Sequence, residues 1–252
     1  MTLAVDIPGR WDCVTIAGKR ADVYSPAGDD LHPGAILFLH GHRLETLAGN
    51  EVFTREFARH RIPVVCPHGA RSWWLDRICT DFDNALTPMS YLREQVVPWI
   101  SEQWRIAPPL IGLMGISMGG QGAFQLAYRH AREFPVVAAI SPAVDFQKLM
   151  GQGLPLDEMF VDAEAARQQT VTLNLHPLNW PRHQLFVCDP TDAGWYEGTE
   201  CLASKLASSG ILFECDLETS AGGHSWDYFN FMAERTVGFV AEQLLKESRR
   251  EA

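Results

Sequence analysis

The side chain best placed to do chemistry in this sequence is the hydroxyl of Ser117. It stands in the segment GISMG (115–119), which fits the pattern G-x-S-x-G. The apolar segment LIGLMG (110–115) leads into it, and a segment with helical spacing, 118–130, follows it. In such a strand–turn–helix unit, a sharp turn exposes the serine oxygen and requires small neighbouring residues. The pattern therefore predicts a serine nucleophile at the tip of a tight turn.

A serine hydroxyl is a weak nucleophile unless a nearby base removes its proton. The best candidate base is His224, which stands in the glycine-flanked segment AGGHSW between a predicted strand, 211–217, and the last predicted helix. In chains that use this turn, the acid and then the histidine follow the serine. His176 and His183 are alternatives, but both precede the expected acid. We therefore expect His224 to be the base.

The acid that orients the histidine is expected just beyond the predicted strand QLFVCD (184–189). Asp189 and Asp192 both lie near the carboxyl end of this strand. Asp189 is close enough to the strand to be a turn residue, whereas Asp192 lies further out and can reach the loop of His224. We expect Asp192 to be the acid, and Asp189 remains the alternative.

Two backbone N–H groups must stabilise the oxyanion that forms when a serine attacks a carbonyl group. One is expected from Met118, directly after the nucleophile, and the other from His42 in the loop after the predicted strand AILFLH (35–40). We expect structural roles for the imidazoles of His40 and His42, because no carboxylate cluster completes a metal site with them. We therefore expect no metal ion and no cofactor.

Buried strands that alternate with helices must position these residues. Short apolar runs predict strands at 35–40, 62–67, 110–115, 135–141, 184–189 and 211–217, and an alternating segment around Gly18-Lys19 predicts a hairpin. Helices are expected at 50–60, at 90–104 with Ser90 as N-cap and a kink or break at Pro98, and at 118–130, 157–169, 197–210 and 227–250. This alternation predicts an α/β fold whose mainly parallel sheet has helices on both faces. We expect one domain over 1–252, with 146–183 as a candidate short cap insertion.

The composition indicates an ordinary soluble protein. Of its 252 residues, 46% are hydrophobic and 21% are charged, and the formal net charge is −10. This acidic balance disfavours nucleic-acid and anionic-membrane partners. The six scattered cysteines form no C-x-x-C pair and are expected to be reduced thiols. The segment MTLAVDIPGRWDC lacks the features of a signal peptide, so a cytoplasmic location is expected.

Several of these segments together resemble the serine esterases of the α/β-hydrolase superfamily. The segments are YLREQVVPWISEQWRI, GISMGGQGAFQLAYRH, PTDAGWYEG and GGHSWDYF, in that order. The nearest group is the one that includes esterase D (S-formylglutathione hydrolase), feruloyl esterases and the antigen 85 mycolyltransferases. The resemblance covers about residues 35–245 and implies an α/β-hydrolase fold and a triad of Ser117, Asp192 and His224. It also implies acyl-ester chemistry without a cofactor. The loop HGHRLE (40–45) departs from the formylglutathione enzymes, so their substrate does not carry over.

The expected activity is hydrolysis of a small-molecule carboxylic ester through an acyl-enzyme intermediate. An acyltransferase or thioesterase could use the same triad, and a non-catalytic hydrolase-like binding protein is a further alternative. Tryptophans in the loops around the site are candidates for the substrate pocket, above all Trp74, Trp195 and Trp226, with Trp73 and Tyr196 beside them. The sequence does not predict the ester or the oligomeric state.

Overall fold

The computed structural model describes residues 8–250, and its centre is an eight-stranded sheet with the order β1-β2-β4-β3-β5-β6-β7-β8. The strands are β1 (Gly9–Ile16), β2 (Lys19–Pro26), β3 (Ala35–Leu39), β4 (Val64–Pro67), β5 (Ile111–Ile116), β6 (Val136–Ile140), β7 (His183–Val187) and β8 (Glu214–Asp216). β2 pairs antiparallel with β1 and β4, and all other neighbours are parallel. The predicted mainly parallel sheet is confirmed. The expectation that no signal peptide is present falls partly on residues 1–7, outside the described residues.

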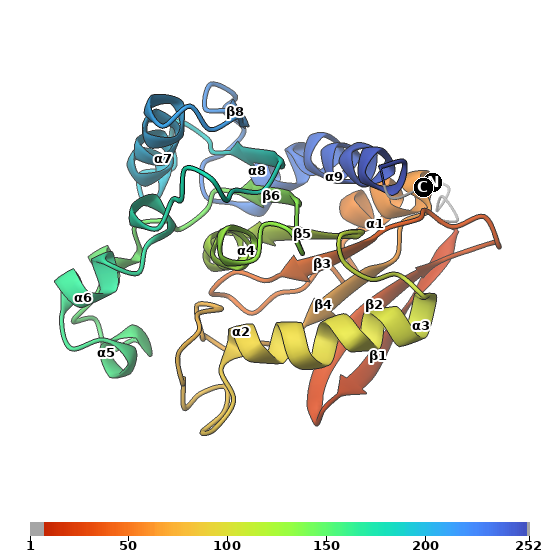
Figure 1. Ribbon diagram of the computed structural model, residues 1–252, viewed down its shortest axis with the longest axis horizontal. Coiled ribbons are helices and arrows are strands. Elements are labelled where there is room, and N and C mark those ends of the chain that lie inside the picture. Colours follow the sequence, from red (N-terminus) through yellow and green to blue (C-terminus); the bar gives the residue numbers. More distant parts are fainter. Residues whose placement is uncertain (1–7, 251–252) are drawn as a thin grey trace, which may run out of the picture.

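Helices cover both faces of this sheet, as predicted (Figure 1). One hydrophobic cluster packs α1 and α9 on one face, and the other packs α2, α3, α4 and α7 on the opposite face. The helices are α1 (Glu51–His60), α2 (Pro88–Tyr91), α3 (Val97–Trp104), α4 (Met118–Arg129), α5 (Leu156–Met159), α6 (Ala163–Arg167), α7 (Tyr196–Ser208), α8 (Trp226–Phe231) and α9 (Ala233–Ser248). Three shorter helical segments are the π-helical turn η1 (Leu92–Val96) and the 3₁₀ turns η2 (Phe146–Leu149) and η3 (Val171–Leu173).

The central strands are apolar throughout because both faces of the sheet are covered. Every residue of β3 and β5 is buried. In β5, Leu113 belongs to the cluster with α4, whereas Met114 belongs to the cluster with α9. This alternation is the two-residue period of a strand, and a strand buried on both sides therefore reads as a continuous hydrophobic run.

The helix predicted at 90–104 differs from the structure at its start and around its proline. Thr87, not Ser90, is the N-cap: its hydroxyl accepts a hydrogen bond from the Ser90 N–H at 3.1 Å. The chain stays helical through the π-helical turn η1 into α3, and Pro98 lies in the first turn of α3. A wider turn therefore accommodates the missing N–H and the ring of Pro98, without a break in the helix.

Two further helices are divided in the structure. The segment predicted as one helix over 157–169 forms α5 and α6, separated at Phe160, which is buried in the core and has an extended backbone. Asp162 then caps α6, since its carboxylate accepts a hydrogen bond from the Ala165 N–H at 2.7 Å. The last helix starts at Trp226 and is interrupted at Met232. Within residues 8–250, no helix is both long and apolar enough to cross a bilayer.

Candidate active site

Ser117 forms the turn between β5 and α4, and its backbone is strained. Its dihedral angles are φ 57° and ψ −119°, a region that residues with a side chain rarely occupy. The Ser117 N–H donates to the carbonyl oxygen of Ile140 at 2.9 Å, which ties the turn to β6. A Cβ atom on Gly119 would lie 1.9 Å from the carbonyl oxygen of Leu39, so only glycine lets α4 approach β3 this closely.

His224 lies in the loop between β8 and α8, and its imidazole joins the serine to a carboxylate. Its Nε2 atom lies 3.0 Å from the Ser117 Oγ, and its Nδ1 atom lies 2.7 Å from the Asp192 Oδ2. The ring packs edge-on against Phe229, with centroids 5.2 Å apart. With the proton on Nδ1 donated to Asp192, Nε2 is free to accept the serine proton.

Asp192 lies in the loop after β7, and its carboxylate is buried, with 1% of the side chain exposed. Its second oxygen, Oδ1, accepts hydrogen bonds from the N–H groups of Gly194 and Trp195 at 3.1 and 3.2 Å. Burial by itself raises the pKa of such a group, but the hydrogen bonds from His224 and these amides outweigh it and hold the Asp192 pKa below its ordinary value. The carboxylate is therefore ionised at neutral pH.

The side chains of the alternative acid, Asp189, and of the alternative bases, His176 and His183, form no hydrogen bond to the side chains of Ser117, His224 or Asp192 in the described chain. The Asp189 carboxylate bonds to Thr191 and to the backbone of residues 221 and 223, and not to the imidazole of His224. His176 lies in a turn, where its Nδ1 accepts from the Leu178 N–H at 3.1 Å. The Nε2 of His183 lies 3.0 Å from Glu247 on α9. Of the two candidate acids, Asp192 is the one in contact with His224.

The predicted oxyanion donors lie on the loop after β3 and at the start of α4. A Cβ atom on Gly41 would lie 3.3 Å from the carbonyl oxygen of Ile116 and 3.4 Å from the Ser117 Cβ, so this loop packs against the serine turn. Within residues 8–250, the N–H groups of His42 and Met118 donate no hydrogen bond to the protein. Neither N–H group is therefore used by an acceptor within the described residues.

His40 fixes the start of this loop through both ring nitrogens. Its Nε2 accepts a hydrogen bond from the Gly69 N–H at 3.0 Å, and its Nδ1 donates to the Gly41 carbonyl oxygen at 2.9 Å. Burial lowers the pKa of His40 to about 4, so the ring is neutral near pH 7. His42 instead lines the cavity described next. Among residues 8–250, no three or more side chains of His, Cys, Asp or Glu are grouped so that they could hold a metal ion.

A cavity of about 250 Å³ opens beside Ser117 and His224. Trp195 and Trp226, two of the tryptophans predicted as pocket candidates, line this cavity. The remaining lining residues are Gly41, His42, Arg43, Glu45, Trp73, Ile116, Leu149, Ser225 and Phe229. The walls are mainly aromatic and aliphatic, and Leu149 comes from the predicted cap segment. Phe229 could have been found from the sequence, because it stands three residues after Trp226 on one helix.

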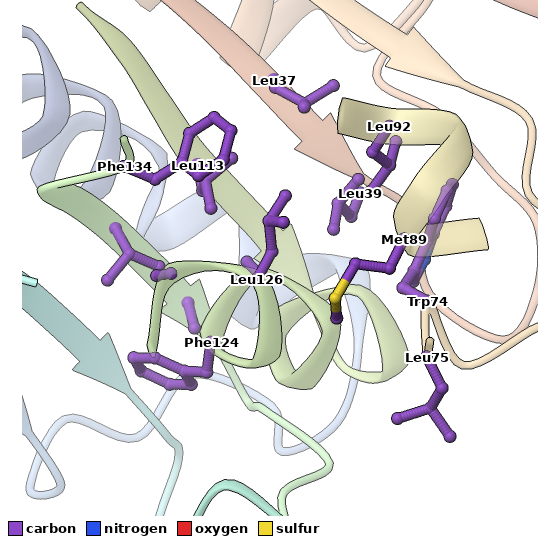
Figure 2. Close-up of a cluster of buried hydrophobic side chains, with 14 of the residues drawn as sticks. Leu37, Leu39, Trp74, Leu75, Met89, Leu92, Leu113, Phe124, Leu126 and Phe134 are labelled. Atoms are coloured by element: carbon purple, nitrogen blue, oxygen red, sulfur yellow. The ribbon is translucent and has the colours of Figure 1, made fainter. Parts of the chain in front are cut away.

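Trp74, which we expected in this pocket, lies in the hydrophobic core instead. Its side chain is fully buried, and its indole N–H donates to the carbonyl oxygen of His40 at 3.1 Å. Its side chain fills space left by two glycines: a Cβ atom on Gly69 would lie 2.3 Å from the Trp74 ring, and one on Gly122 would lie 2.4 Å from the Trp74 Cβ. Figure 2 shows Trp74 among the side chains of the core cluster. Its neighbour Trp73 lines the cavity.

The sheet order, the serine turn and the order of the site residues along the chain are those of the α/β hydrolases. A comparison with protein families matches residues 20–212 to the family described as "Putative esterase". The chain belongs to this family, which confirms the predicted resemblance, and it is an esterase of the hydrolase class. A comparison with curated proteins gives no match.

Solved structures of similar proteins share the fold across nearly the whole chain. The S-formylglutathione hydrolase of Agrobacterium tumefaciens has a TM-score of 0.75 at 17% identity, over 95% of this chain and 97% of its own. The fluorophosphonate-binding serine hydrolase FphF of Staphylococcus aureus has a TM-score of 0.73 at 16% identity, over 93% and 99%. MPT51 of Mycobacterium tuberculosis has a TM-score of 0.70 at 18% identity, over 92% and 99%. Because the identities are below 25%, these similarities establish the α/β-hydrolase fold but not a shared substrate.

Proposed function

We propose that this chain is a serine carboxylic-ester hydrolase that works through a Ser-His-Asp triad and an acyl-enzyme intermediate. The observation that carries this proposal is the continuous chain of hydrogen bonds from the Ser117 Oγ through His224 to Asp192. These three hydrogen-bonded residues lie beside an apolar cavity, where a small ester can place its carbonyl carbon next to the serine oxygen.

In the first half of the reaction, His224 accepts the Ser117 proton on Nε2 while the serine oxygen attacks the acyl carbonyl carbon. The negative charge that develops on the carbonyl oxygen is stabilised by the N–H groups of His42 and Met118. His224 then gives its proton to the leaving alcohol, and the acyl group stays bound to Ser117.

In the second half, a water molecule takes the place of the alcohol. His224 removes a proton from the water, the hydroxide attacks the acyl-enzyme, and the carboxylic acid leaves as Ser117 regains its proton. Asp192 stays ionised throughout: it holds the imidazole in the required tautomer and stabilises the imidazolium form. The substrate is a small-molecule ester whose apolar part packs against Trp73, Trp195 and Trp226.

The test is the hydrolysis of p-nitrophenyl esters, from acetate to a long acyl chain, by the wild type and by Ser117→Ala. We expect turnover by the wild type and a fall in kcat of at least about 10⁴-fold in the variant. Ser208→Ala is the matched control, because Ser208 is an exposed serine on α7 and should keep full activity. A Ser117→Ala enzyme with the wild-type rate would overturn the proposal.

A further inference from the structure

The mechanism leaves one buried charged group near the site without a role, the carboxylate of Asp189. Asp189 follows β7 and is fully buried. Its Oδ1 accepts hydrogen bonds from the Thr191 N–H at 2.7 Å, the Thr191 hydroxyl at 2.7 Å and the Ser220 hydroxyl at 3.0 Å. Its Oδ2 accepts from the N–H groups of Ala221 and Gly223 at 2.6 and 2.9 Å.

These five donors keep the carboxylate ionised without a cation in contact. Burial raises the pKa of a carboxyl group, but the hydrogen bonds from Thr191, Ala221 and Gly223 hold the Asp189 pKa well below its usual range. Among the described residues, Asp189 forms no ion pair with Lys, Arg or His. A buried charge is costly unless it is fully hydrogen-bonded, so this environment depends on the geometry of residues 191 and 220–223.

Three of the five donors belong to the segment 220–223, which directly precedes His224. This segment contains Gly222 and Gly223, with φ angles of 108° and 68°, so its backbone has little stiffness of its own. Gly223 also packs against Thr191: a Cβ atom there would lie 3.4 Å from the Thr191 hydroxyl. The carboxylate therefore fastens the backbone one residue before the imidazole that contacts Ser117.

We propose that Asp189 is a positioning residue for His224, an inference that rests on the proposed function. The loop after β7 holds the histidine at two points. Asp189 binds the backbone that leads into His224, and Asp192, three residues later, binds the imidazole itself. The first contact sets the distance from Nε2 to the Ser117 Oγ, and the second sets the tautomer and orientation of the ring.

The direct test is Asp189→Asn. The amide keeps an oxygen that can face Thr191 and Ser220, but it places an NH₂ group against the N–H groups of Ala221 and Gly223. We expect kcat for a p-nitrophenyl ester to fall about 10²-fold, the loss typical of a small misplacement of a catalytic group, with KM within about threefold of wild type. Labelling of Ser117 by a fluorophosphonate should slow by a similar factor, because it needs the activated serine.

Glu247→Gln is the matched control for a purely structural effect. Glu247 on α9 is another buried carboxylate, with 1% of its side chain exposed, and it accepts hydrogen bonds from Arg182 and His183. We expect this variant to unfold at a lower temperature but to keep kcat per folded molecule. If Asp189→Asn also loses only stability and keeps kcat within about threefold, the proposal is wrong.

Ser220→Ala covers the case in which Asp189→Asn does not fold. It removes a single hydrogen bond between the histidine loop and Asp189 and leaves the carboxylate in place. We expect kcat to fall about fivefold, the equivalent of one hydrogen bond, whereas an unchanged kcat would overturn the proposal. A wild type that neither hydrolyses esters nor reacts with the fluorophosphonate would overturn the proposed function as well. If the wild type is active and both Asp189→Asn and Ser220→Ala keep the wild-type kcat, the positioning role of Asp189 is wrong, whereas the proposed function stands.

Discussion

At the scale of single residues, the strained backbone of Ser117 is maintained by neighbours on both adjoining strands. Its N–H bonds to Ile140 on β6, and its carbonyl oxygen accepts from the Ala143 N–H at 3.0 Å. On the other side, Gly119 lies against the end of β3. The serine can hold a conformation that is unfavourable by itself because these contacts fix the backbone around it.

Gly119→Ala tests how closely α4 must approach β3. The new Cβ atom would lie 1.9 Å from the Leu39 carbonyl oxygen and 2.7 Å from that of His40, and both are backbone atoms of a central strand and its end. We expect a loss of about 3 kcal/mol or more in the free energy of unfolding, measured by urea denaturation.

Gly120→Ala is the control for that substitution, since the nearest heavy atoms, in Pro142, lie 3.2 Å from its added Cβ. A small shift relieves this contact, and alanine also favours the helix over glycine by about 1 kcal/mol. If Gly119→Ala and Gly120→Ala were equally stable, the close approach of α4 to β3 would not be the reason for a glycine at position 119.

The three residues of the Ser117–His224–Asp192 hydrogen-bonded chain could be singled out from the sequence because patterns point to them. Ser117 has the G-x-S-x-G turn, and the chain order of acid and histidine points to Asp192 and His224. No such pattern separates Trp73 from Trp74. Both have positive φ, at 57° and 55°, so neither follows the alternation of a strand or the spacing of a helix. Which ring faces the cavity depends on the space left by distant glycines.

At the scale of elements, His40 joins the end of β3 to the loop after β4. Its ring is fully surrounded, and its two hydrogen bonds need a proton on Nδ1 and none on Nε2. A second proton would abolish the bond from the Gly69 N–H and place a charge in the interior. The loop that carries His42 is therefore tied to the neutral form of His40.

This link predicts a pH dependence of stability. The His40 pKa is about 4 in the folded protein and 6.5 when the ring is in water, so unfolding takes up a proton between these values. The stability that the neutral His40 contributes to the folded protein is fully present above about pH 6.5. It is lost as pH falls from about 6.5 to about 4, which lowers the free energy of unfolding by about 3 kcal/mol in total.

Urea unfolding of the wild type and His40→Gln between pH 8 and pH 5 measures this effect. We expect the wild type to lose more stability over this range than the variant, in which residue 40 does not titrate. Other histidines contribute equally to both proteins, so parallel curves would contradict the assignment to His40.

The order of the elements was predictable, whereas their interruptions were not. Apolar runs such as 35–40 and 110–115 are strands because both faces of the sheet are covered. The division at Phe160 arises because that ring packs into the core against Phe146 on η2, a contact that local sequence does not encode. The break at Met232 could not be predicted either, because no glycine or proline lies next to it.

At the scale of the whole molecule, two separate hydrophobic clusters hold the helices on the sheet. Leu113 of β5 belongs to one of them and is fully buried. The predicted fold could be recognised from the sequence because these clusters need alternating buried strands and amphipathic helices. The depth and lining of the cavity could not, since they depend on how loops from several strands meet.

Leu113→Ala tests the contribution of this core. We expect a loss of about 3 kcal/mol, seen as a lower urea midpoint with an unchanged slope, because the central strand cannot move to fill the space. Leu212→Ala is the control, since 77% of Leu212 is exposed, and its effect should stay within about 0.5 kcal/mol. If Leu113→Ala also lost no more than about 0.5 kcal/mol, the sheet would have to relax into the space left by the removed side chain.

The most direct test of the proposed mechanism is to locate the residue that reacts with a fluorophosphonate, by intact mass and peptide mapping. We expect one adduct per folded chain, on Ser117, and none in Ser117→Ala or in the urea-unfolded protein. An adduct on another residue of an enzyme that hydrolyses esters, or no adduct in such an enzyme, would contradict the assignment of Ser117 as the nucleophile.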